Sequence, residues 1–187
     1  EVVEDLKIRK KTNKILLFAR WRFHLTGERF NNQEGGKEIG KSHYHVPLNE
    51  KNLIEQKSRE KIILTKIELF INEISKLDKK IFVVLPTPEM GWEIPNNLAR
   101  ILHLKNKIDK NTLSISKNLF IKENKQVYEF FDNMKKKYDI KLIDPNKVFC
   151  NRTRCTSHIN EIPLYFDDDH LSKFGSKVLS EYILSKL

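Results

Sequence analysis

The residues best suited to chemistry lie near the C-terminus, in the stretch 164–172 (LYFDDDHLS). There Asp167 precedes His170 by three residues, and in a tight turn this spacing brings a carboxylate to one ring nitrogen of the imidazole. The carboxylate then fixes the tautomer, while the other ring nitrogen faces outward as a general base for a hydroxyl nucleophile. The pattern predicts that Asp167 and His170 form an acid–base pair, seated just before a helix.

The same stretch allows two other interpretations. Three consecutive aspartates ahead of a helix could balance its dipole, or they could bind a divalent cation through their carboxylates. A second candidate metal pair, His43 and His45, has no neighbouring cysteine or carboxylate that completes a ligand set. We therefore predict no metal site, although the spacing of Asp167 and His170 alone leaves the other interpretations open.

Short apolar runs and amphipathic stretches alternate along the chain. Short apolar runs are typical of strands buried on both faces of a parallel sheet, and strands are predicted at 14–19, 81–85 and 140–143. Residues 1–11 are predicted to be the end of a helix, and further helices are predicted over 49–78, 96–105, 122–137 and 173–186. Ser172 is the expected N-cap of the last one, and a long loop is predicted at 22–48. The alternation predicts an α/β fold with a mostly parallel sheet, as a single domain over residues 1–187.

The sheet should gather the candidate site residues at one edge. Ligands of such folds bind outside the carboxyl ends of the strands. This rule places Arg20 and Trp21 beside the segment from Pro86 to Trp92 and beside the loop with Asp167 and His170. His24 follows closely enough to reach the same cleft.

The net charge of +10 comes mostly from lysine. Such a charge suits a nucleic acid or an anionic surface as partner, but the basic residues are scattered and the densest runs, 7–11 and 135–137, lie at predicted helix ends. We predict no nucleic-acid partner, and a basic nucleic-acid-binding protein or metallonuclease remains the third hypothesis for the function.

Four residues separate the two cysteines, Cys150 and Cys155. A zinc site would need more ligands, and a thioredoxin-like motif would need two intervening residues. A local disulfide fits best and implies an oxidising compartment, with two free thiols as the alternative. The bond would fix the loop just before the segment that contains Asp167.

Four ordered stretches resemble the SGNH domains that are fused to type-3 membrane acyltransferases, enzymes that O-acetylate surface polysaccharides. The stretches are 16–21 (LLFARW), 85–95 (LPTPEMGWEIP), the cysteine pair, and 165–172 (YFDDDHLS) followed by Gly175. This resemblance covers nearly the whole chain and implies a three-layer α/β/α, flavodoxin-like SGNH fold.

The resemblance also implies roles for individual residues. Asp167 and His170 match the acid and the base of the family's triad. Arg20 and Trp21 occupy a strand end where many SGNH enzymes place an oxyanion-hole asparagine, so they are candidates for the substrate site or oxyanion stabilisation, as are His24 and Trp92. Rim packing is the alternative for both tryptophans.

The implied function is acyl transfer, with acetyl as the expected group and a glycan or another ester as substrate. No cofactor is expected, because an N-terminal membrane acyltransferase domain would supply the acyl group. That parent would hold the chain at the periplasmic face of a bacterial inner membrane. Transfer to a glycan hydroxyl and hydrolysis share the same first half, and the sequence does not separate them.

One departure from the family is large: the sequence contains no Gly-Asp-Ser, the block that carries the nucleophile. The chain opens at Glu1 without an initiator methionine or a signal pattern. We therefore expect a fragment whose first strand and helix are missing, inactive by itself because the acid–base pair has no serine to activate. The second hypothesis is a catalytically dead remnant that binds glycan.

Overall fold

A computed structural model describes residues 1–44 and 56–187. Three parallel strands form its central sheet in the order β1-β2-β4: β1 (Lys14–Leu17), β2 (Lys80–Val84) and β4 (Ile140–Ile143). The register aligns Ile15 with Ile81 and Ile81 with Ile140. The predicted α/β class and parallel sheet are confirmed, although β1 ends two residues earlier than the apolar run suggested.

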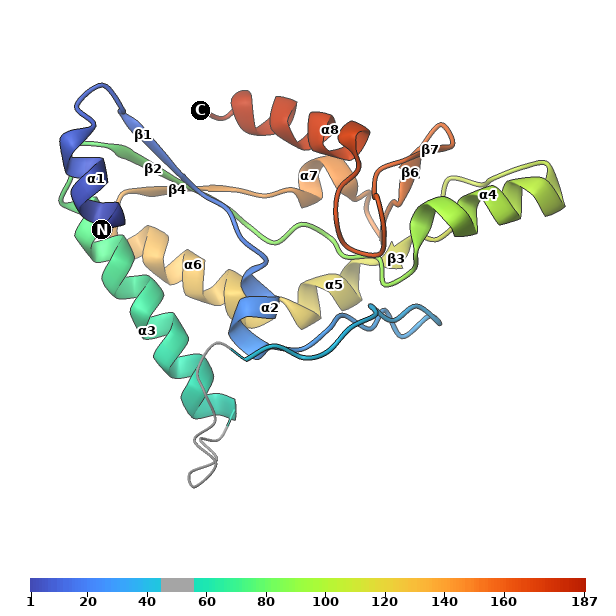
Figure 1. Ribbon diagram of the computed structural model, residues 1–187, viewed down its shortest axis with the longest axis horizontal. Helices are drawn as coiled ribbons and strands as arrows, with labels where there is room; N and C mark the ends of the chain where they lie inside the picture. The colour runs from blue at the N-terminus through green and yellow to red at the C-terminus, as the bar shows by residue number, and fades with distance from the viewer. Residues whose placement is uncertain (45–55) are drawn as a thin grey trace.

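The two faces of β2 contact different helices, which makes the fold three-layered. Phe82 and Val84 belong to one buried cluster with Leu179 and Ile183 of α8. The alternate residues of β2 face a second cluster, formed with α3 and α6. In Figure 1, α8 accordingly lies on one side of the strands, with α3 and α6 on the other. The longest helices are α3 (Gln56–Ser75), α4 (Ile94–Lys105), α6 (Lys125–Lys137) and α8 (Lys173–Leu184), and α1 (Val2–Ile8) precedes them at the N-terminus.

The predicted loop at 22–48 contains a short helix, α2 (Trp21–Thr26). It begins directly after β1 and ends at Gly27, whose φ of 75° is left-handed. Trp21 anchors its start by donating from Nε1 to the carbonyl oxygen of Val84, 2.7 Å away. Six residues are too few to reveal a helical period in the sequence, so the prediction of a loop there was wrong.

The helix predicted over 122–137 is two helices, α5 (Lys117–Glu123) and α6. They meet at Asn124, whose side-chain amide donates to the carbonyl oxygen of Phe120 at 2.9 Å. An asparagine competes in this way with the helical hydrogen bonds and favours a break. Of the helix predicted over 49–78, α3 covers 56–75, and residues 49–55 lie outside the described part of the chain.

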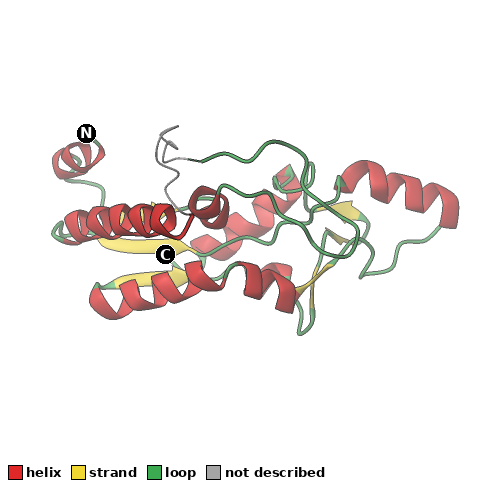
Figure 2. Cartoon of the chain, turned by 90° about the horizontal axis from the view of Figure 1, so that it is seen from below, coloured by secondary structure: helices red, strands yellow, loops and turns green. Residues whose placement is uncertain are grey.

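The loops that follow the strands gather at one end of the sheet, and α4 extends beyond them (Figures 1 and 2). Short elements that the sequence did not predict tie these loops together: β3 (Ile115–Ser116), α7 (Asn146–Phe149), β5 (Arg154–Cys155), β6 (His158–Ile159) and β7 (Ile162–Pro163). Over the described residues, none of the helices combines the length and apolar character that a membrane span requires.

Candidate active site

The loop that carries Asp167 and His170 is a tight turn between β7 and α8. The Phe166 amide donates to the carbonyl oxygen of His170 at 2.7 Å, which closes the turn. At its end, Ser172 Oγ accepts from the Gly175 amide at 3.1 Å and donates to the carbonyl oxygen of Pro163 at 2.7 Å. Ser172 is therefore the N-cap of α8, as predicted, and it fixes where the turn meets the helix.

Within this turn Asp167 and His170 are hydrogen-bonded. Asp167 Oδ2 lies 2.9 Å from His170 Nδ1. The other oxygen, Oδ1, accepts from the amides of Asp169 at 3.0 Å and His170 at 2.7 Å. The spacing therefore produces the predicted geometry: the carboxylate is held by two backbone donors and presented to one ring nitrogen.

The surroundings shift the pKa values of both groups. Burial acts to raise the pKa of Asp167, but the two amides and the imidazole outweigh it, so this pKa lies below its ordinary value. The hydrogen bond to Asp167 raises the pKa of His170 above its ordinary 6.5, against a smaller opposing effect of burial. At neutral pH the turn thus presents an ionised Asp167 beside an imidazole of raised basicity.

His170 opens onto a cavity of about 460 Å³ at the carboxyl ends of the strands. Its side chain is 67% exposed. The walls of the cavity come from the end of β1, the turn after β2, the α5–α6 break and α8. The lining residues are Phe18, Ala19, Arg20, Trp21, Arg22, Pro86, Thr87, Glu89, Asn124, Asp169, His170, Leu171 and Ser176.

The segment from Pro86 to Trp92 cradles the Asp167–His170 turn. The carbonyl oxygen of Asp168 accepts from the amides of Met90 at 2.9 Å and Gly91 at 3.1 Å. The buried Tyr165 hydroxyl donates to the carbonyl oxygen of Pro88 at 2.8 Å. The segments that the sequence placed on one rim are therefore in direct contact.

Arg20 forms ion pairs with three carboxylates that come from different segments around the turn. Its guanidinium lies 2.9 Å from Glu38, 2.9 Å from Glu89 and 2.6 Å from Asp169. Glu38 comes from the long loop, where its carboxylate also accepts from the Phe30 amide and pairs with Arg29. The sequence did not predict these ion pairs. Glu38 and Glu89 are distant from Arg20 along the chain, and Asp169 was considered only as part of the acidic run at 167–169.

The contacts of Arg20 favour a positioning role over oxyanion stabilisation. Nε donates to Glu89, while both terminal nitrogens donate to Glu38, so donors on all three nitrogens are engaged. Burial raises the pKa of Glu89 despite the neighbouring Arg20. The acids raise the already high pKa of Arg20, more than offsetting its desolvation, so its charge is constant at any working pH.

Replacing Arg20 by alanine is expected to destabilise the fold by about 3–5 kcal/mol, because three carboxylates would face one another without their shared cation. Urea unfolding measures the change. The matched control is Arg9→Ala, which removes an exposed pair with Asp5 and should change stability little. Equal losses in the two variants would contradict a central role for Arg20.

The other candidate residues take different places. Trp21 lines the cavity and packs edge-on against Phe131, with ring centroids 4.8 Å apart. Trp92 does not line the cavity. Its ring lies against Gly36, where an added Cβ would come within 2.8 Å of two ring carbons. His24 lies in α2 next to Phe23 and is also outside the cavity lining.

The cluster of Asp167, Asp169 and His170 offers one possible cation site. One potential ligand atom from each residue lies within 4.8 Å of the others. The second oxygen of Asp169, however, is already 2.6 Å from the Arg20 guanidinium, and a fixed positive charge at this position opposes a divalent cation. These residues therefore fit a metal poorly. Of the alternative pair, His45 lies outside the described residues.

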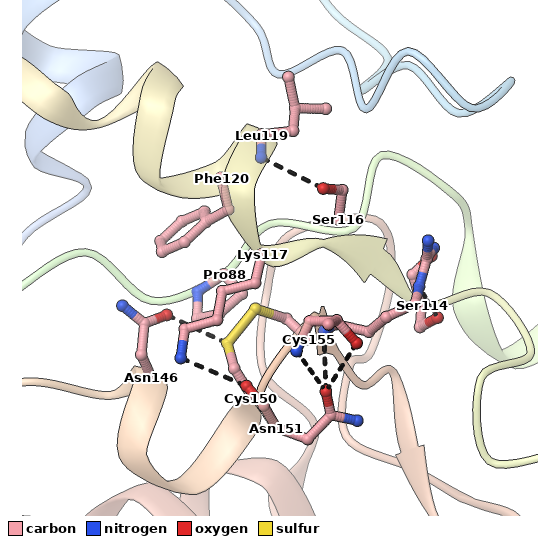
Figure 3. Close-up of a disulfide and its surroundings, with 12 residues drawn as sticks. Pro88, Ser114, Ser116, Lys117, Leu119, Phe120, Asn146, Cys150, Asn151 and Cys155 are labelled. Atoms are coloured by element: carbon pink, nitrogen blue, oxygen red, sulfur yellow. Dashed lines mark hydrogen bonds between the residues drawn. A yellow bond between two sulfur atoms is a disulfide. The ribbon is translucent and has the colours of Figure 1, made fainter.

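The predicted disulfide between Cys150 and Cys155 is present (Figure 3). It joins the C-terminal end of α7 to β5, where Cys155 is fully buried. β5 pairs in turn with β3, and β3 leads into α5 through the N-cap Ser116. The bond thus joins the end of α7 to a strand that pairs with the segment leading into α5.

The fold and this site define a class: a three-layer α/β protein with a paired aspartate and histidine beside a cavity at the carboxyl ends of parallel strands. The family model for the SGNH domain (fused to AT3 domains) matches residues 1–185, and the chain belongs to this family. The match confirms the resemblance drawn from the four sequence motifs.

Among solved structures, the chain is similar to the periplasmic domain of the lipopolysaccharide acetyltransferase of Salmonella ser. Paratyphi A. The TM-score is 0.52 at 22% identity, over 76% of this chain and 54% of that one, so the match spans about half of the length of that domain. This likeness supports the shared fold. The comparison with curated proteins returned no match.

Proposed function

We propose that this chain provides the acid–base pair and much of the substrate cavity of an SGNH-type O-acyl-transfer site. The observation that carries the proposal is the hydrogen bond from His170 Nδ1 to Asp167 beside an open cavity. His170 Nε2 would accept the proton of a serine hydroxyl and return it to the departing alcohol. Asp167 would stabilise the imidazolium formed between these steps.

The proposal also covers the acyl group, its donor and acceptor, and the location of the protein in the cell. The acyl group is acetyl, the acceptor a hydroxyl of a cell-surface glycan, and the donor an AT3 domain of the kind to which SGNH domains of this family are fused. The similar Salmonella protein is a periplasmic domain of an acetyltransferase, which supports acetyl as the group and the periplasm as the location. The nucleophile is assigned to a Gly-Asp-Ser segment of the parent protein, because residues 1–187 contain none.

The test begins with the longest reading frame that contains this chain. We expect it to encode Gly-Asp-Ser, and we expect the purified product to release nitrophenol from 4-nitrophenyl acetate. A frame without that block, whose product binds glycan and turns over no ester, would instead support the second candidate function, a non-catalytic glycan-binding domain.

The pH dependence of this reaction should report His170. Only the neutral imidazole can accept the serine proton, and its pKa lies above the ordinary 6.5 because of Asp167. We therefore expect kcat/KM to rise with pH through an inflection above 6.5 and then to level off. An inflection below that value, measured with 4-nitrophenyl acetate across a buffer series, would contradict this role of the pair.

A further inference from the structure

A second carboxylate reaches the same ring nitrogen as Asp167. Asp169 Oδ1 lies 3.0 Å from His170 Nδ1, while its Oδ2 lies 2.6 Å from Arg20 Nη1. We propose that Asp169, anchored by Arg20, is a positioning residue that shares with Asp167 the task of keeping the proton on Nδ1. The catalytic meaning of this inference rests on the proposed function, but its geometry does not.

The inference follows from what a neutral imidazole can donate. One of its nitrogens carries a proton and the other a lone pair. Carboxylate oxygens at 2.9 and 3.0 Å from Nδ1 would both repel a lone pair there, so the proton must sit on Nδ1. Nε2 is then left with its lone pair directed outward, the form that a general base needs.

The two carboxylates differ in their exposure to solvent, and this difference strengthens the electrostatic effect of Asp169 on the imidazole. The Asp167 side chain is 32% exposed, whereas that of Asp169 is 3% exposed. Water screens a buried charge less, so the field of Asp169 at the ring is stronger for a given distance. Arg20 offsets part of the cost of burying this carboxylate and lies 2.6 Å from its Oδ2.

The same burial places the protonation of Asp169 near neutral pH. Desolvation raises its pKa to about 7, although Arg20 and His170 both act to lower it. The charged groups that face the ring are Asp167, Asp169 and Arg20, with Glu38 and Glu89 behind Arg20. Protonation of His170 and of Asp169 should therefore be linked.

Asp168 is the natural control for this idea. It has the same side chain and lies between the two partners of His170, but its Oδ2 accepts from the Ile39 amide at 2.9 Å. Asp168→Asn removes an equal charge from the same turn without removing a neighbour of the ring nitrogen. The comparison of Asp169→Asn with Asp168→Asn thus separates a specific effect on His170 from a general loss of negative charge.

The experiment is an NMR titration of the ¹⁵N-histidine-labelled chain, which yields the pKa and the tautomer of His170. We expect Asp169→Asn to lower this pKa by about one unit and to reduce the population protonated on Nδ1, and Asp168→Asn to shift it by less than half as much. The signal of the buried His158 shows in each variant that the fold is retained. Equal shifts in the two variants would overturn the proposal.

A second measurement decides the matter if Asp169→Asn does not fold. In the unmodified chain, the carboxyl ¹³C signal of Asp169 should show an inflection at the pKa of His170, larger than the inflection of Asp168. A response no larger than that of Asp168 would overturn the proposal. Neither measurement involves turnover, so a protein without esterase activity could still confirm the role of Asp169, and an active one could still refute it.

Discussion

Replacing His170 by alanine in the parent protein is expected to lower kcat/KM for 4-nitrophenyl acetate by about 10³-fold or more. The imidazole is the acceptor that the geometry offers to a serine hydroxyl, because His170 lines the cavity while its Nδ1 is held by Asp167. Its removal costs little packing, since the side chain is 67% exposed. Thermal unfolding should therefore change little while the rate falls.

The matched control is His103→Ala, which removes an exposed imidazole from α4, outside the lining of the cavity. Its kcat/KM should remain within about twofold of the unmodified protein, since surface substitutions away from a site change stability and geometry little. If His170→Ala retained comparable activity, the Asp167–His170 pair would not be the acid–base pair of this reaction.

A large effect on stability is also expected from Gly175→Ala in α8. Alanine is favoured over glycine in a helix by about 1 kcal/mol. Here, however, the added Cβ would lie 2.0 Å from the backbone carbonyl oxygen of Leu164. Backbone atoms cannot rotate away, so α8 would have to move from the loop that it supports. We expect a net loss of about 3 kcal/mol or more in urea unfolding, because overpacking against rigid atoms outweighs the propensity gain.

The control for this substitution is Ser180→Ala, at an exposed position of the same helix. It combines the propensity gain with the loss of one exposed hydrogen bond from Ser180 Oγ to the carbonyl oxygen of Lys177, so stability should change little. A Gly175→Ala variant as stable as the unmodified chain would mean that α8 and the residues before the turn do not approach each other so closely.

The strands and the Asp167–His170 pair were predictable because each is encoded locally. The run at 81–85 is apolar without alternation, since helices cover both faces of the sheet at this central strand. The pair needs only a three-residue turn, and Ser172 marks where the helix begins. Such features are determined by residues that are close together in the sequence, so a sequence pattern is enough to predict them.

The support around the pair could not be predicted in the same way. Arg20 meets Glu38, Glu89 and Asp169 only after four segments have folded together, and no local pattern pairs them. Trp92 belongs to a segment that was correctly placed, yet its ring is used to pack against Gly36. The proximity of segments followed from the sheet, whereas the partner of each side chain depended on packing that sequence spacing does not specify.

The disulfide between Cys150 and Cys155 makes the connection between α7 and β5 depend on the redox state of the compartment in which the chain folds. The reducing systems of the cytosol keep cysteines as free thiols. A chain that remained in the cytosol would therefore lack the covalent connection between α7 and β5. The bond would then form only in an oxidising space, and α7 and β5 would become covalently joined there. Recombinant material made without oxidation should accordingly be compared with oxidised material before any rate is assigned to the sequence itself.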